Sequence, residues 1–287
     1  MRKTVLVLVV ILLLGQVFPA FSELYMDQEP PAEWADRTDI LRLTAFQTLE
    51  NDCFLMEAGG KSMLIDGGVN KWRFLLRDAL KELDRWHVDV IFNTHPHDDH
   101  LECVYWLLKM GLTADEFWSG FEKTYGNELQ RQTVHQLDKM GIPYHQLSQY
   151  ETVDFGGATL VFYWWEEGDD PNACSVQMHV TFGESTMLLT ADIGGNAERH
   201  LLDEVPPELL KADILKYPHH AIRQTYPEYM DAVDPLFAFV TNRKINVYDA
   251  YRQLDSRGIQ VCYTTAGRLV LVTDGKDWYV KQYKEHF

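Results

Sequence analysis

Residues 94–100 read Thr94-His95-Pro96-His97-Asp98-Asp99-His100 and carry three imidazoles and two carboxylates. The apolar stretch Val88-Asp89-Val90-Ile91-Phe92 precedes this run, and the helical pattern of residues 101–108 follows it. Neutral imidazole nitrogen and carboxylate oxygen are ligands that zinc and similar divalent ions accept. A tight loop between a strand and a helix can direct His95 and His97 to one ion and Asp99 and His100 to another. The sequence therefore predicts a loop that binds two metal ions, not merely a solvated histidine-rich loop.

Three further segments carry residues of the same chemistry. Residues 51–68 contain Asp66 before a Gly-Gly pair, residues 187–193 contain Asp192, and residues 212–220 end in His219-His220. With the histidine loop, these segments resemble the motifs of the metallo-β-lactamase-fold hydrolases in their family order, over about residues 39–275. The resemblance implies the four-layer αββα sandwich of that family in a single domain. The alternation of strand patterns and amphipathic helices by itself indicates only an α/β protein.

Within that superfamily, the chain resembles most the branch typified by the hydrolase domain of the competence protein ComEC. The shared elements are the loop of residues 94–100, the run Asn172-Ala173-Cys174-Ser175 and the run Leu215 to His220. The chain departs from that branch at Ala221-Ile222, where Gly-Ser is usual. A substrate contact made by that serine is therefore not expected here, and DNA uptake does not carry over without the transmembrane channel of the competence protein.

The resemblance implies two divalent ions that share Asp192. The ligands implied for the first ion are His95, His97 and Asp192, with Asn172, Cys174, Ser175 or water in place of a third histidine that is absent here. The ligands implied for the second ion are Asp99, His100, Asp192 and His219. Zinc is the expected metal, and oxygen-rich coordination makes manganese the alternative. A single ion at the second site is the other arrangement that the ligand sets allow.

The remaining site residues are expected to support these ligands. By the resemblance, Asp66 and Thr94 belong to the residues around the ligand histidines, and Asp66 orients them. Adjacent residues on a strand face opposite ways, so only one of His219 and His220 is expected to bind metal directly, and the resemblance favours His219. The catalytic residues expected are Asp99, Lys216 to neutralise a phosphate oxygen, and His220 to contact substrate or supply a proton. Lys216 could equally be a surface charge.

These residues predict a hydrolase. Two ions roughly 3.5–4 Å apart lower the pKa of a shared water and stabilise charge on the substrate oxygen. A metal-bound hydroxide is thus expected to cleave a small or polymeric phosphodiester, such as a nucleotide, a nucleic acid or a headgroup. Two alternatives stay open: a non-catalytic binding module with a structural metal, and a β-lactamase-like amide hydrolase, a group that generally uses the third histidine.

The formal net charge of −17 indicates a strongly acidic surface. Nucleic-acid binding draws much of its affinity from Lys and Arg that neutralise phosphates, so no stable complex with DNA or RNA is expected. The oligomeric state does not follow from the sequence. The cysteines are far apart and lack a Cys-x-x-Cys pair, and we expect free, buried thiols, with one or two disulfides as the alternative that export permits.

Residues 1–22 have the pattern of a secretory signal peptide. Arg2-Lys3 precede the apolar residues 5–14, and Ala20-Phe21-Ser22 provide small residues before Glu23. We therefore expect secretion or another extracytoplasmic location, without membrane contact once the segment is cleaved. An uncleaved segment would instead act as a membrane anchor. Residues 23–38 are expected to form a polar linker, and residues 39–287 the hydrolase domain.

Overall fold

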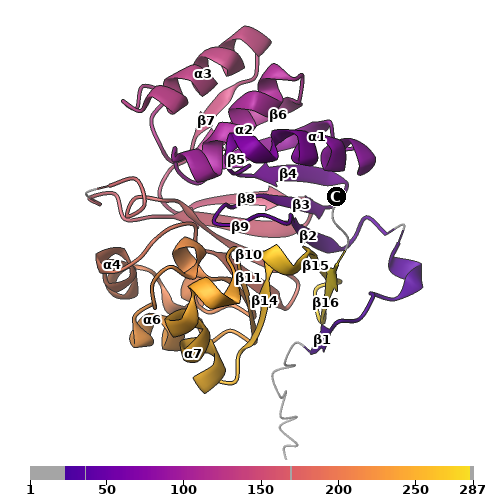
Figure 1. Cartoon of the computed structure of the whole chain (residues 1–287), viewed down its shortest axis with the longest axis vertical. Coiled ribbons are helices and arrows are strands. Elements are labelled where there is room, and N and C mark those ends of the chain that lie inside the picture. Colours follow the sequence, from indigo (N-terminus) through magenta and orange to yellow (C-terminus); the bar gives the residue numbers. More distant parts are fainter. Residues whose placement is uncertain (1–22, 36, 169, 285–287) are drawn as a thin grey trace, which may run out of the picture.

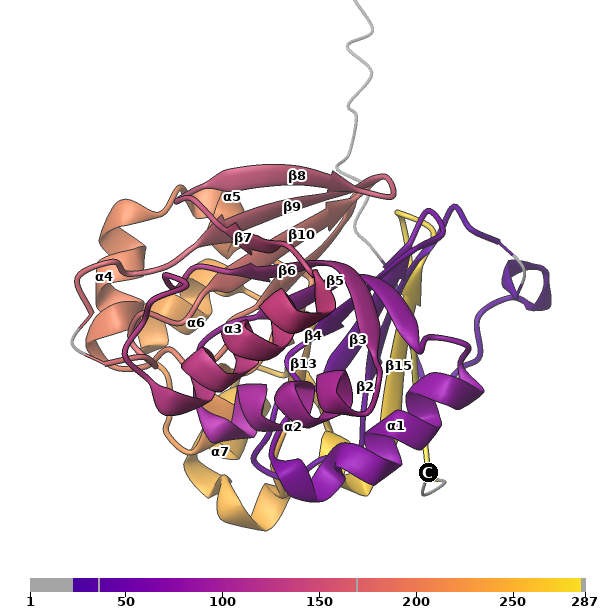
Figure 2. The same cartoon turned by 90° about the horizontal axis from the view of Figure 1, so that it is seen from above.

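The computed structural model describes residues 23–35, 37–168 and 170–284, so the predicted signal peptide lies outside the described residues. Two sheets face each other, and helices lie on both outer faces (Figures 1 and 2). This arrangement confirms the αββα sandwich. Within the described part of the chain, we find no helix with the length and apolar character needed to cross a membrane.

The first sheet has nine strands in the order β1-β16-β15-β2-β3-β4-β5-β6-β7. Their bounds are β1 Leu24–Met26, β2 Leu41–Ala45, β3 Phe54–Ala58, β4 Lys61–Ile65, β5 His87–Asn93, β6 Thr113–Ser119, β7 Tyr144–Gln146, β15 Arg268–Thr273 and β16 Trp278–Tyr283. Helices α1 (Arg73–Glu82), α2 (Asp98–Lys109) and α3 (Glu128–Met140) pack on its outer face. Because side chains alternate along a strand, Phe54 and Met56 lie between the sheets while Leu55 packs under the helices.

The second sheet has seven strands in the order β14-β13-β12-β11-β10-β9-β8. Their bounds are β8 Glu151–Phe155, β9 Ala158–Tyr163, β10 Gln177–Phe182, β11 Ser185–Leu189, β12 Ile214–Lys216, β13 Phe237–Val240 and β14 Gln260–Tyr263. The helices on its outer face are α4 Asn196–Glu204, α5 Pro207–Leu210, α6 Pro227–Val233 and α7 Tyr248–Ser256. The short 3-10 helices are η1 Ala32–Trp34, η2 Asn70–Trp72, η3 Pro218–Ala221, η4 Lys244–Asn246 and η5 Thr264–Ala266.

Part of the segment expected as a linker belongs to the first sheet. Strand β1 pairs in parallel with β16, from Leu24 opposite Trp278 to Met26 opposite Val280. In η1, the Trp34 ring packs edge-on against Tyr279, with 5.2 Å between ring centroids. Residues 23–35 therefore extend the sheet and cover part of its outer surface.

The four cysteines are free thiols, as expected, but only two of them are fully buried. Cys53 and Cys103 are buried, whereas Cys174 and Cys262 are partly exposed.

The topology brings several strand ends to one edge of the sandwich. In the first sheet β4 and β5 are parallel, and in the second sheet β11, β12 and β13 are parallel. The carboxyl ends of parallel strands point the same way, and the crevice outside them is a common place for ligands. The polar residues that follow these strands are Asp66 after β4, residues 94–97 after β5, Asp192 after β11, residues 217–220 after β12 and Thr241 after β13.

Candidate metal centre

Four side chains converge where these strand ends meet. Asp99, His100, Asp192 and His220 each offer a ligand atom, and these atoms lie within 4.8 Å of one another. The Oδ2 atom of Asp192 is 3.2 Å from His100 Nε2 and 3.1 Å from His220 Nε2. His220 Nε2 is also 3.2 Å from Asp99 Oδ2. Two imidazoles and two carboxylates thus face a common point.

The His100 ring is oriented toward this point by a carboxylate behind it. Its Nδ1 lies 2.7 Å from Asp66 Oδ2, while its buried Nε2 has no hydrogen-bond partner. Asp66 is fixed in turn by Asn93 and by the Thr94 backbone and hydroxyl, which all donate to it over 2.7–2.9 Å. A histidine that donates one ring N–H to a carboxylate presents the other nitrogen as a ligand. The unpartnered Nε2 therefore fits a metal ion.

The electrostatics of the cluster favour positive charge at this point. Burial lowers the pKa of His220, but Asp192 and Asp52 outweigh burial and raise it to about 10. Burial likewise opposes ionisation of His100, and Asp192 and Asp66 raise its pKa well above the usual value. The carboxylates that favour an imidazolium here would also favour a divalent cation.

His95 and His97 form a second, smaller group. Burial holds the pKa of His95 well below its usual value, so the ring is neutral and able to act as a ligand. Its Nε2 is 3.2 Å from His97 Nδ1. Among the residues that the structure describes, no third histidine, cysteine or carboxylate places a ligand atom within 4.8 Å of both members of this pair.

The three residues expected to complete this first site occupy different positions. The Cys174 thiol donates to the carbonyl of Gly168 at 3.3 Å. The hydroxyl of Ser175 accepts from the backbone N–H of Asp192 at 3.2 Å, so it positions that residue. Only Asn172 keeps a buried side-chain oxygen, Oδ1, without a hydrogen-bond partner, and this residue lines the adjacent pocket.

The order of His219 and His220 differs from the sequence expectation. The Nε2 atom of His219 is 3.8 Å from Asp192 Oδ2, its side chain is 23% exposed, and it lines the pocket. His220 is the histidine inside the four-residue cluster. Strand alternation does not govern these two residues, because β12 ends at Lys216 and the backbone turns, with left-handed φ angles of 47° at His219 and 49° at His220.

Lys216 lies behind Asp192. Its side chain is 0% exposed, and its Nζ is 2.5 Å from Asp52 Oδ2 and 3.4 Å from Asp192 Oδ1. It also donates to the backbone carbonyl of Ala191 at 2.8 Å. The amine is therefore not available to a substrate oxygen in the pocket. Instead of neutralising phosphate, as expected, Lys216 holds Asp192 in position.

Two residues of this network were not singled out from the sequence. Burial raises the pKa of Asp52, but Lys216 and His220 outweigh burial and lower it to about 2. Thr241 donates to Asp52 at 2.9 Å, and its hydroxyl is 2.8 Å from His220 Nδ1. Asp52 lies two residues before β3, and Thr241 directly follows β13. Each is a polar residue beside an apolar strand, at the edge of the sandwich where the other site residues lie. This pattern is the signal that could have identified them.

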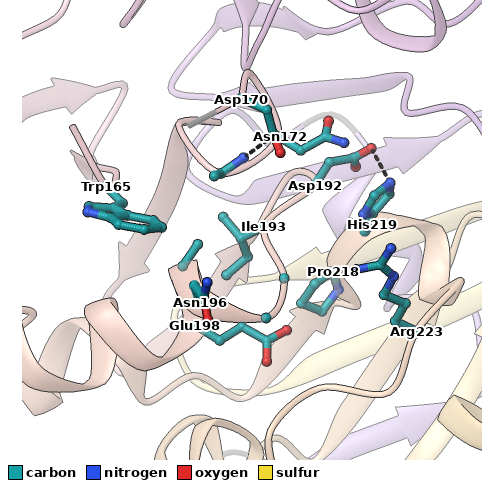
Figure 3. A pocket seen from close by; sticks show the side chains of 14 residues that line it. Trp165, Asp170, Asn172, Asp192, Ile193, Asn196, Glu198, Pro218, His219 and Arg223 are labelled. Carbon is teal, nitrogen blue, oxygen red and sulfur yellow. Dashed lines mark hydrogen bonds and ion pairs between the residues drawn. The ribbon is translucent and has the colours of Figure 1, made fainter. Parts of the chain in front are cut away.

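A pocket of about 360 Å³ opens beside Asp192 (Figure 3). Its lining residues are Trp165, Asp170, Asn172, Ala173, Asp192, Ile193, Gly194, Gly195, Asn196, Ala197, Glu198, Pro218, His219 and Arg223. In Figure 3 the guanidinium of Arg223 lies on the same side as His219, and Trp165 lies on the opposite side. The pocket therefore has a cationic side next to the candidate metal ligands and an aromatic side away from them.

Comparisons with known proteins agree with this fold. Residues 48–235 match the family model of the metallo-beta-lactamase superfamily, and the chain belongs to that superfamily. It is similar to YhfI, a metallo-beta-lactamase fold protein from Bacillus subtilis, with a TM-score of 0.51, 14% identity, and 78% of this chain and 96% of that chain covered. It is also similar to CmlA, a diiron beta-hydroxylase from Streptomyces venezuelae, with a TM-score of 0.50, 13% identity, and 81% and 53% covered. None of the curated proteins compared with the chain matches it.

Proposed function

We propose that the protein is an exported metal-dependent hydrolase of phosphodiester bonds. The observation that supports a metal most directly is the His100 Nε2 atom, which is buried, forms no hydrogen bond and lies 3.2 Å from the Asp192 carboxylate. We assign Asp99, His100, Asp192 and His220 to the ion at this point, so His220 takes the ligand role that the resemblance gave to His219. His95 and His97, with Asp192, are the residues for a second ion.

The residues around the candidate metal centre would then have different roles. When bound, divalent ions supply Lewis acidity, which lowers the pKa of a coordinated water and stabilises charge on the substrate oxygen. Asp66 holds His100, and Asp52 and Thr241 hold His220, which fixes the direction of both ring nitrogens. Lys216 and Ser175 hold Asp192. His219 reaches the pocket beside Asp192 and is the residue we assign to substrate contact.

The pocket supports an anionic substrate of small size. Arg223 lines it and forms no ion pair with any residue that the structure describes. A guanidinium fits phosphate geometry well because it can donate two parallel hydrogen bonds. The overall charge of −17 opposes a long polyanion, so a small phosphodiester is favoured over a stable nucleic-acid complex.

The proposals of export, of a relation to the ComEC-type branch and of the metal's identity rest on the sequence. The pattern of residues 1–22 supports export. The loop of residues 94–100 and the run 215–220 support a relation to the ComEC-type branch. Zinc is the metal we propose, with manganese as the alternative, because the ligand set combines imidazoles with carboxylates.

Removal of metal should abolish hydrolysis of bis(p-nitrophenyl) phosphate. The reason is that the residues lining the pocket include no serine, threonine or cysteine that could act as a nucleophile, so attack by water depends on a bound cation. The measurement is turnover by the chain lacking residues 1–22, before and after chelation, and after separate addition of zinc and manganese. A lactam and p-nitrophenyl acetate complete the panel. Turnover of the diester that persists after confirmed loss of metal would contradict the proposal, and exclusive turnover of the lactam would favour the amide hydrolase.

A further inference from the structure

Glu198 is a buried acid that the proposed reaction does not use. It lies in the first turn of α4, is 2% exposed, and lines the pocket beside Asp192. Its Oε2 accepts from the backbone N–H of Tyr226 at 2.7 Å. No cation pairs with Glu198 among the residues that the structure describes, and the neighbouring Arg199 donates to the Tyr226 hydroxyl instead. A buried carboxylate without a cation is costly, so this position is suited to a cation supplied by a ligand.

The pocket separates two kinds of recognition group. In Figure 3, Asp192, His219 and Arg223 lie toward one side, Trp165 lies on the far side, and Glu198 lies between them along the lower edge. The Trp165 ring is held by stacking on His200, with centroids 5.1 Å apart and 26° between the ring planes. An indole ring attracts an organic ammonium group, most strongly when the cation is partly removed from water. Anionic and cationic ends of one small molecule could therefore be bound at once.

We propose that Glu198 and Trp165 form a subsite for the organic ammonium group of a zwitterionic phosphodiester whose phosphate lies toward Arg223 and Asp192. This substrate class rests on the proposed phosphodiesterase function. It explains why an acidic side chain is buried in a pocket that otherwise carries a cation for phosphate. A choline-type headgroup carries both charges within one small molecule.

The ionisation of Glu198 supports this reading. Burial raises its pKa to about 8. The titratable groups that face it are the phenols of Tyr217 and Tyr229, whose pKa values burial holds above their usual value, so both stay neutral. Arg223 lines the same pocket. A folded-state pKa above the unfolded value for an acid means that stability is lost as pH rises from about 4.5 to about 8. A bound ammonium group would stabilise the charged carboxylate.

The test compares p-nitrophenyl phosphorylcholine with p-nitrophenyl 3,3-dimethylbutyl phosphate, in which a carbon atom replaces the ammonium nitrogen and only the phosphate charge remains. We expect kcat/KM to be at least about tenfold higher for the cationic ester, and E198Q to lower that ratio to about one. The matched control is Glu228→Gln, which removes an exposed acid on α6 outside the pocket and should leave the ratio unchanged. A ratio that E198Q leaves intact, or an unmodified protein that does not prefer the cationic ester, would overturn the subsite.

Binding measurements separate this proposal from the phosphodiesterase proposal. Titration calorimetry with choline should detect binding to the unmodified protein, with at least about tenfold weaker binding to E198Q and to Trp165→Leu. Choline binding without hydrolysis of any diester would support the subsite and contradict the proposed phosphodiesterase function. Hydrolysis of a diester without choline binding would support the proposed function and contradict the subsite. Folding of E198Q is checked by its Tm, which should exceed that of the unmodified protein at pH 8 but not at pH 4.5.

Discussion

Replacement of Lys216 with Met should lower the free energy of unfolding of the metal-free protein by about 3–5 kcal/mol. The side chain is fully buried, and its amine is the cation closest to Asp52 Oδ2 and also contacts Asp192. Loss of one partner from a buried ion pair leaves the remaining carboxylates uncompensated, which costs far more than loss of a surface pair. Chemical denaturation of the chelated protein measures the change.

Two variants keep this prediction interpretable. Lys211→Met removes a lysine whose ion pair with Asp234 is exposed at both side chains, and its effect should stay below about 1 kcal/mol. The double change Asp52→Asn with Lys216→Met removes both members of the buried pair and should recover part of the loss. A cost for Lys216→Met as small as that for Lys211→Met would show that the amine is not paired as described.

His220→Ala and His219→Ala should have different effects on metal and rate. His220 Nε2 lies within 3.2 Å of two carboxylates, so its loss should empty the metal site formed with Asp99 and Asp192 and lower kcat/KM by more than about 100-fold. His219 lies 3.8 Å from Asp192 at the pocket edge, so its loss should leave metal bound and mainly raise KM. Elemental analysis and steady-state kinetics on the same preparations provide both readings.

Circular dichroism and Tm of both variants show whether metal loss reflects a lost ligand or a lost fold. Asp99→Asn serves as a further ligand variant, since Asp99 is on the surface side of the cluster and its loss should disturb the core less. Should His219→Ala lose the ion while His220→Ala retains it, the ligand role returns to His219, as the resemblance implied.

The histidine loop and Asp192 could be identified from the sequence because each is a short motif next to an apolar strand. Parallel strands bring such strand ends together, so the convergence of the four-residue cluster follows from local patterns and topology. The sandwich itself was an inference from resemblance, since periodicity does not distinguish it from other α/β arrangements.

The features that the sequence did not reveal depend on a single turn or on contacts between distant segments. Strand alternation places Lys216 on the same inner face as Ile214, yet its partner Asp52 lies in the loop before β3 of the other sheet. The roles of His219 and His220 depend on consecutive left-handed residues after Pro218. Ala221 continues this turn with φ of 58°, where glycine is usual in the resembled branch. Glu198 reads as an ordinary helix residue, and only packing against the turn before Tyr226 buries it.

Strand β1 also determines where the chain can be shortened without harm. The carbonyl of Glu23 accepts from the backbone of Trp278, and β1 occupies the outer edge of β16. A chain that began at residue 39, the boundary suggested by the sequence, would leave β16 as a bare edge strand with unpaired N–H and C=O groups. It would also uncover Tyr279, on which Trp34 packs. Exposed edges of this kind promote pairing between molecules, so a soluble recombinant protein needs to start at or before residue 23.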